Sequence, residues 1–283
     1  MRPNPRLLPT ATPASVGLRF ESVEFTPADV PIKLRAWWIP TENAKASLVM
    51  AHGGGEDNRS LPYGHGLELM RDLAAHGYSV LALDLRNFGE SDASPDARPT
   101  FGLREANDVV AAIDYLASRR ASDRFGAIGF SMGGSTVLYA AARDTRIEAV
   151  VSDSAFADSR AIAVNFVHAS MGIPPWLTRP LLWSAEKLHG VPLGAGRAVD
   201  VIGAIAPRRL LVIQDQSDPI VPVEQARQLA AACPGAELWI TDTAKGRADP
   251  FGTHIKSYTN DPTAYVARVT QFFDATFVPE RRN

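Results

Sequence analysis

The sequence has little cysteine and little net charge. Only one of its 283 residues is a cysteine, Cys233, so the chain can form neither an internal disulfide nor a cysteine-rich metal cluster. Its formal net charge of −2 excludes the basic excess that nucleic-acid-binding proteins carry. We therefore expect no nucleic-acid partner.

Long apolar runs and repeats are also missing. Residues 1–17 contain four prolines and no apolar stretch long enough for a signal peptide or a membrane span. Beyond this proline-rich start we find no internal repeat, linker or low-complexity segment. The simplest expectation is a cytoplasmic protein without a membrane anchor, although removal of a leader would leave the same sequence.

The apolar residues that are present follow the pattern of a sheet. Alternating apolar and polar residues at 19–25 and 32–39 predict an antiparallel hairpin at a sheet edge, with one face towards solvent. Short, mostly apolar runs predict further strands buried on both faces, at 47–51, 78–83, 125–128, 147–151, 209–213 and 236–240.

Helical patterns lie between these strands, at 66–76, 103–119, 223–233 and 262–277. The last of them begins after Asp261, a favourable N-cap residue. Alternating strands and helices are typical of a doubly wound α/β fold. We therefore predict one α/β domain over residues 1–283, with a mostly parallel eight-stranded sheet and helices on both faces.

One connection is longer than a plain crossover requires. About 55 residues separate the strand that ends near Asp153 from the strand that begins near Arg209. The interval contains Phe166, Trp176 and Trp183, and we interpret residues 156–206 as a small helical cap inserted into the domain. We predict that these three aromatic side chains contact a substrate, although they could instead pack helices onto the core.

The segment Gly129-Phe130-Ser131-Met132-Gly133 has the Gly-x-Ser-x-Gly spacing of a nucleophile elbow. An apolar strand precedes the serine and a helix of small residues follows it. A tight turn between them lifts the hydroxyl clear of the sheet, beside the unpaired N–H groups of a helix N-terminus. We therefore predict Ser131 as a nucleophile.

A serine nucleophile needs a base and an acid that orients the base. With an elbow of this kind the chain order is serine, acid, histidine. Of the six histidines only His254 follows the candidate acid loop, so we predict His254 as the base. We favour Asp218 as the acid over Asp215, because Pro219 holds the Asp218 backbone extended beyond the strand. Asp153 is a third candidate.

An oxyanion would need two N–H donors. Met132 directly follows the serine at the helix N-terminus and is the first candidate donor. The second should come from the glycine-rich loop after the strand at 47–51, where we favour Gly54 and keep Gly55 as an alternative. His52 is expected to brace this loop by hydrogen bonding.

Together these motifs resemble the α/β-hydrolase superfamily, in particular its serine esterase and peptidase-like branches. The landmarks follow the order of that superfamily: His52-Gly53-Gly54, residues 84–91, residues 129–133, residues 218–222 and His254. The resemblance implies the α/β-hydrolase fold and an acid at Asp218. The chain departs from the usual pattern in having Gln214-Asp215 where His-Gly is common, and Phe251-Gly252-Thr253-His254 where Gly-x-Gly-His is common.

We interpret the chain as a serine hydrolase that cleaves small-molecule carboxylic esters with short, medium or aromatic acyl groups. No metal and no organic cofactor is implied. A peptidase, an amidase or a thioesterase would use the same Ser-His-Asp triad, and a ligand-binding protein of this fold without catalysis is the alternative from another class. The sequence does not indicate the oligomeric state.

Overall fold

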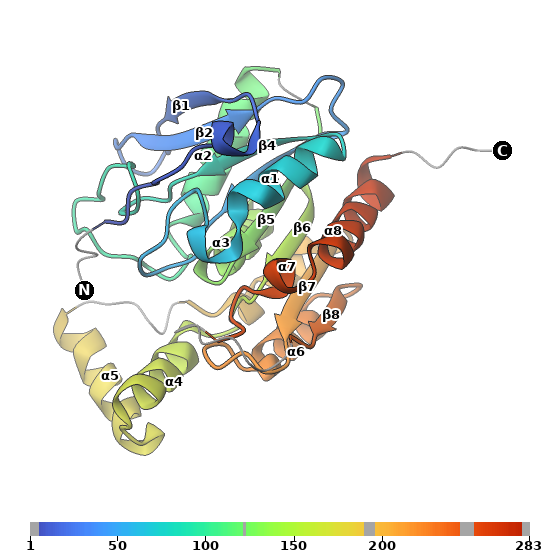
Figure 1. The fold of residues 1–283 in the computed structure, drawn as a ribbon. Helices are drawn as coiled ribbons and strands as arrows, with labels where there is room; N and C mark the ends of the chain where they lie inside the picture. Colours follow the sequence, from blue (N-terminus) through green and yellow to red (C-terminus); the bar gives the residue numbers. More distant parts are fainter. Residues whose placement is uncertain (1–5, 121–122, 190–195, 244–251, 279–283) are drawn as a thin grey trace.

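The computed structural model describes residues 6–120, 123–189, 196–243 and 252–278 (Figure 1). The strands in this part form one eight-stranded sheet in the order β1-β2-β4-β3-β5-β6-β7-β8. β1 and β2 pair antiparallel, as do β2 and β4, and the remaining pairs are parallel. The strands are β1 (Glu21–Phe25), β2 (Leu34–Ile39), β3 (Ala46–Ala51), β4 (Tyr78–Leu83), β5 (Phe125–Phe130), β6 (Ile147–Asp153), β7 (Arg209–Asp215) and β8 (Glu237–Thr241).

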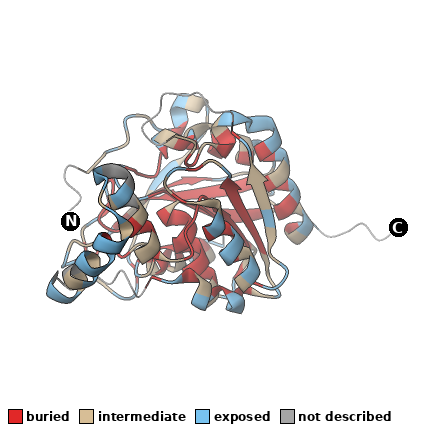
Figure 2. Cartoon of the chain, turned by 90° about the horizontal axis from the view of Figure 1, so that it is seen from below, coloured by how far each residue is buried: buried red, intermediate tan, exposed pale blue. Residues whose placement is uncertain are grey.

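Helices cover both faces of the sheet. α1 (Gly66–Ala75) and α8 (Pro262–Phe277) pack against one face, where their buried residues share a core with Leu48 and Met50. α2 (Ala106–Ser118), α3 (Met132–Arg143) and α6 (Val223–Ala232) pack against the other, with Val49 and Ala51. Successive β3 side chains therefore enter opposite cores, as strand geometry requires. Figure 2 shows the buried residues concentrated in the strands and on the inward sides of the helices.

The predicted α/β-hydrolase fold, with its mostly parallel eight-stranded sheet, is confirmed. Two expectations about solvent were wrong. β2 has no solvent-facing side, because the cores on both faces of the sheet extend over it: Trp37 is buried in one and Trp38 in the other. β8 is not buried on both faces, because it forms the far edge of the sheet and its residues are half-buried or exposed.

The helix predicted at 103–119 begins three residues later, at Ala106. The reason is the side chain of Glu105, which accepts hydrogen bonds from the Thr100 N–H at 2.8 Å and the Gly102 N–H at 3.0 Å. These bonds shape residues 100–105 into a loop before the helix begins. The predicted N-cap of the last helix is confirmed, since Asp261 accepts a hydrogen bond from the Ala264 N–H.

Between β6 and β7, the range 156–206 contains α4 (Ser159–Met171) and α5 (Pro175–His189). Asp158 caps α4 by accepting from the Arg160 and Ala161 N–H groups, and Gly172 ends it at a positive φ of 68°. Figure 1 shows the two helices beside each other at one end of the molecule. Residues 190–195 lie outside the described part of the chain.

The other short elements are α7 (Ser257–Asn260) and the 3-10 turns Pro13–Val16, Pro62–Gly64, Ala198–Asp200 and Ile202–Ile205. No helix among the described residues combines the length and the apolar character needed to cross a bilayer.

Candidate active site

Ser131 lies at the turn between β5 and α3, as the elbow motif predicts. Its backbone has φ 52° and ψ −117°, a conformation that L residues with a Cβ rarely adopt. The glycines around it allow close approach. A Cβ at Gly129 would collide with the carbonyl oxygen of Gly133, and a Cβ at Gly133 would collide with that of Ala51. The turn is therefore tight because β5 and β3 both press against the start of α3.

The structure brings Ser131, His254 and Asp218 together from three separate segments. The Oγ of Ser131 lies 2.9 Å from the Nε2 of His254. The other ring nitrogen of His254, Nδ1, lies 2.7 Å from the Oδ2 of Asp218. His254 and Asp218 are both buried. These distances give one continuous hydrogen-bonded chain from the hydroxyl to the carboxylate.

Asp218 is held firmly at the end of β7. Its Oδ1 accepts hydrogen bonds from the N–H groups of Ile220 and Val221 at 2.8 and 2.9 Å. Its Oδ2 accepts a further bond from Nε2 of Gln214 at 2.9 Å, and the same amide nitrogen donates to the Val221 carbonyl. Gln214 was missed in the sequence analysis, although its departure from the superfamily pattern pointed to the position.

Asp215, the alternative candidate for the acid, bonds to the loop after β7 and to the end of β8. Its Oδ1 accepts from the Ser217 N–H at 2.9 Å, and its Oδ2 accepts from the Thr243 N–H at 2.6 Å. The hydroxyl of Thr241 also donates to Oδ2, at 3.2 Å. Asp215 therefore ties the loop after β7 to β8 and its following residues, and no contact between it and His254 is recorded among the described residues.

The glycine-rich loop after β3 lies beside the elbow. A Cβ at Gly54 would be 3.5 Å from the Cβ of Met132, so the Gly54 backbone is next to the first residue of α3. The Gly53 N–H is already donated to Oδ2 of Asp57, at 2.8 Å. At Gly55 an added Cβ would meet nothing within 4 Å. Of the three glycines, Gly54 is thus the one whose backbone borders Met132.

His52 and Asp57 hold this loop through hydrogen bonds to the backbone of Gly53. His52 has Nδ1 2.7 Å from the Gly53 carbonyl, and its Nε2 accepts from the Leu85 N–H at 3.1 Å. Asp57 also accepts from the Asn58 N–H at 2.9 Å. Burial raises the pKa of Asp57 to about 6, although nearby His52 and the two N–H donors lower it. Asp57 belongs to no sequence motif and was not predicted as part of the site.

The two cap tryptophans predicted to contact substrate are not brought to the triad. Trp176 is 74% exposed and Trp183 is 55% exposed, both on α5. No contact between either side chain and the triad is recorded in the described part of the chain. Phe166 lies on α4, but its side chain falls outside the described residues. The substrate role of all three stays a prediction.

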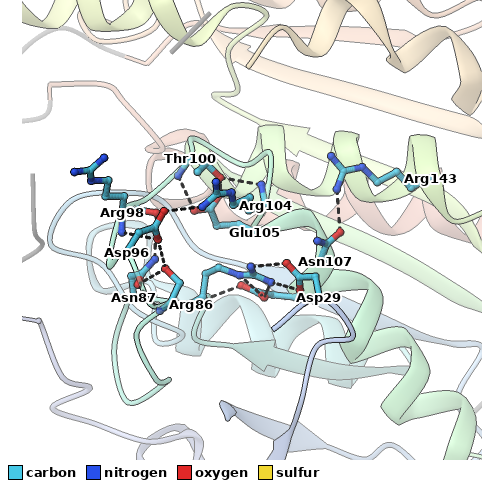
Figure 3. Close-up of polar contacts among 12 residues, drawn as sticks. Asp29, Arg86, Asn87, Asp96, Arg98, Thr100, Arg104, Glu105, Asn107 and Arg143 are labelled. Atoms are coloured by element: carbon cyan, nitrogen blue, oxygen red, sulfur yellow. Dashed lines mark hydrogen bonds and ion pairs between the residues drawn. The ribbon is translucent and has the colours of Figure 1, made fainter. Parts of the chain in front are cut away.

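A polar network centred on the buried Arg86 fixes the loop between β4 and α2 (Figure 3). The guanidinium of Arg86 donates to both Asp108 and Asp29, with every bond at 2.7–2.8 Å. Further along, a Cβ at Gly102 would lie 2.9 Å from the backbone nitrogen of Thr136 in α3. The loop therefore packs against the helix that follows the elbow.

The described residues contain no group of three or more His, Cys, Asp or Glu side chains arranged to hold a metal ion. Cys233 is a free thiol buried at the end of α6, and burial raises its pKa.

Residues 46–198 match the family described as alpha/beta hydrolase fold, and the chain belongs to that family. Among its relatives, the quorum-quenching protein AidA of Acinetobacter baumannii is 34% identical over 169 residues, which cover 58% of this chain and 51% of AidA. An uncharacterized 31.7 kDa protein of Escherichia coli, from the traX-finO intergenic region, is 31% identical over 136 residues, 47% of this chain and 45% of that protein. The chain thus spans about half the length of these relatives.

Solved structures with the same fold include the esterase Pf2001 of Pyrococcus furiosus. It superimposes with a TM-score of 0.77 over 96% of this chain and 97% of the esterase, at 24% sequence identity. At this level of identity the likeness shows the fold alone.

Proposed function

We propose that this protein is a serine hydrolase that cleaves carboxylic esters through an acyl-enzyme. The observation that carries the proposal is the hydrogen-bonded chain from Ser131 through His254 to Asp218. The serine is the nucleophile, the histidine the general base and the aspartate the group that orients the imidazole. Membership of the alpha/beta hydrolase fold family supports the assignment.

In the first step Ser131 Oγ attacks the ester carbonyl while Nε2 of His254 takes the hydroxyl proton. Asp218 accepts from Nδ1–H, fixes the tautomer and stabilises the imidazolium that forms. His254 then returns the proton to the leaving alcohol. Water attacks the acyl-enzyme in the second step with the same base, which releases the carboxylic acid and regenerates the serine.

The negative charge that develops on the carbonyl oxygen needs donors already in position. We assign this role to the N–H groups of Met132 and Gly54, whose backbones lie side by side. Asp57 supports the assignment, because it engages the preceding Gly53 N–H and so orients the loop. His52 braces the same loop from the Gly53 carbonyl.

The proposed substrate is a small ester with a short, medium or aromatic acyl group, bound in part by the apolar cap residues Phe166, Trp176 and Trp183. Concave apolar sites favour such groups. Because one relative is named a quorum-quenching protein, a quorum-quenching assay belongs in the substrate panel beside ester, thioester and amide substrates.

The test is intact-mass analysis after treatment with a fluorophosphonate, which labels activated serines whatever their natural substrate. Wild type should gain one adduct, Ser131→Ala should gain none, and His254→Ala should react far more slowly. His76→Ala is the matched control, because His76 is an exposed histidine that directly follows α1. If folded wild type fails to react, the proposal of an activated serine is wrong.

The choice between the two aspartates gives a second, sharper test. Asp218→Asn should lower kcat about 10³- to 10⁴-fold, because an amide cannot hold the imidazole in the reactive tautomer. Asp215→Asn should keep most of its turnover per folded molecule, since the partners of the Asp215 carboxylate among the described residues, Ser217, Thr241 and Thr243, lie in or beside β7 and β8. Circular dichroism checks that both variants fold. Equal losses, or the reverse order, would refute the assignment of Asp218.

A further inference from the structure

Two buried residues at the end of β6, Asp153 and Ser154, contact all three segments that carry the proposed triad. The Asp153 carbonyl accepts a hydrogen bond from the Ser131 N–H at 2.8 Å. The Ser154 N–H donates to the carbonyl of Ile213 in β7, the strand that leads to Asp218, at 2.9 Å. The Ser154 Oγ accepts from the N–H of Ile255, the residue after His254, at 3.2 Å.

The side chains of the pair form a directed chain of hydrogen bonds. The Ser154 hydroxyl has one proton, and it donates this proton to Oδ1 of Asp153 at 2.8 Å. A lone pair of the same oxygen is thereby turned towards the Ile255 N–H. The second carboxylate oxygen of Asp153 accepts from the hydroxyl of Tyr265 in α8, at 2.8 Å. Hydrogen bonds linked in this way polarise and strengthen one another.

The backbone on both sides of the Ser154–Ile255 bond is strained. Ser154 and Ile255 each have φ 53°. A positive φ is unusual for serine and is an outlier for a β-branched residue such as isoleucine. Such conformations persist only where surrounding contacts hold them, and they concentrate at functional sites. The Ser154 hydroxyl is one contact that holds the strained residue directly after His254.

We propose that Asp153 and Ser154 are positioning residues that hold the His254 loop so that its imidazole meets Ser131. This inference rests on the proposed function. Asp153 acts through Ser154, and Ser154 acts through the backbone of Ile255, so neither touches the substrate. Burial raises the pKa of Asp153 to about 6, while its two hydroxyl donors and nearby His254 lower it and Asp218 raises it. Above this pH the ionised carboxylate accepts from both hydroxyls.

The decisive variants are Ser154→Ala and Ser154→Gly, which both remove the hydroxyl. Glycine also relieves the positive φ, so it keeps the loop foldable if alanine does not. The matched control is Thr270→Val, which removes another buried hydroxyl, one that donates to the Val266 and Ala267 carbonyls of its own helix, α8. We would measure the fluorophosphonate labelling rate together with kcat and KM for p-nitrophenyl acetate, at about pH 8, where Asp153 is ionised.

Both Ser154 variants should lose about 10- to 100-fold in labelling rate and in kcat, with KM nearly unchanged, because a misplaced base slows the chemistry without weakening binding. Thr270→Val should stay within about twofold of wild type in all three quantities. Asp153→Ala should resemble the Ser154 variants. Asp153→Asn should retain most of the activity, because its amide oxygen still accepts from Ser154.

Labelling rates of the Ser154 variants within about threefold of wild type would overturn the inference, as would an equal loss in Thr270→Val. An unchanged rate in Asp153→Ala would remove Asp153 from it. A wild-type protein that does not react with the fluorophosphonate at all is a separate result, because it refutes the proposed serine hydrolase and not only the positioning pair.

Discussion

The strained backbone of Ser131 predicts that replacing this residue by glycine stabilises the protein relative to replacing it by alanine. At φ 52° and ψ −117°, Ser131 lies outside the conformations that residues with a Cβ adopt readily. For glycine the same angles are the mirror image of an ordinary extended conformation, and glycine populates both equally well. Alanine keeps the Cβ and therefore the strain. Both variants lose the hydroxyl, so the loss of the hydrogen bond to His254 cancels in the comparison.

The magnitude follows from two opposing contributions. A residue held in a sparsely populated region costs about 1–3 kcal/mol. Glycine in turn costs about 0.5–1 kcal/mol relative to alanine, because the unfolded chain is more flexible. Taking the middle of each range, Ser131→Gly should be more stable than Ser131→Ala by about 1 kcal/mol. For a chain of this length, unfolding entropy converts that difference into a Tm higher by about 1–3 °C.

Differential scanning calorimetry and urea unfolding of the two variants provide the measurement, and the fluorophosphonate assay confirms that neither reacts. The nearby Gly55 also has a positive φ, but it is already a glycine, so no stabilising replacement of this kind is available there. If Ser131→Gly proves equal to or less stable than Ser131→Ala, the turn is not strained by the Cβ, and the argument for the elbow conformation fails.

Two further predictions concern buried carboxylates. The pKa of Asp57 is raised to about 6 in the folded protein, so the folded protein binds this proton more tightly than the unfolded chain does. The contribution of Asp57 to the free energy of unfolding is therefore largest below pH 4, and it falls by about 3 kcal/mol as the pH rises through 6. Urea unfolding of wild type and Asp57→Asn at several pH values should show the variant gaining most of that amount, about 2 kcal/mol, between pH 4 and 7; a constant difference would contradict the prediction. Arg86→Lys should destabilise by about 3 kcal/mol, because one ammonium cannot bridge Asp108 and Asp29, and a Tm equal to that of wild type would refute this role.

The fold was predictable because its signals are local. The central strands are short and apolar because helices cover both faces, and the helices between them show one apolar side. Local sequence patterns do not reveal the order of the strands in the sheet. β8 resembles a buried strand and β2 resembles a half-exposed one, but their burial depends on which neighbours they acquire. The start of α2 was predicted too early for a related reason: the Glu105 side chain bonds to the N–H groups of Thr100 and Gly102, and the apolar pattern does not reveal these partners.

The candidate site was predictable where motif and chain order carry the information. Ser131 has an elbow motif, His254 is singled out by order, and Pro219 favours Asp218. Gln214 and Asp57 were not predictable in the same way, because their partners are chosen in space. Neither the Gln214 amide nor the Asp57 carboxylate has a local signature that tells which loop atoms it will meet.

The order of strands explains why Asp153 and Ser154 lie where they do. β3, β5, β6 and β7 are parallel neighbours, so their carboxyl ends stand side by side at one edge of the sheet. In that spatial order they carry the proposed oxyanion loop, the proposed nucleophile, the Asp153–Ser154 pair and the proposed acid. The β6 end is therefore the position adjacent to both Ser131 and the strand leading to Asp218, although the sequence separates all three. A residue there can therefore bond to the elbow, the acid strand and the base loop at once, as Asp153 and Ser154 together do.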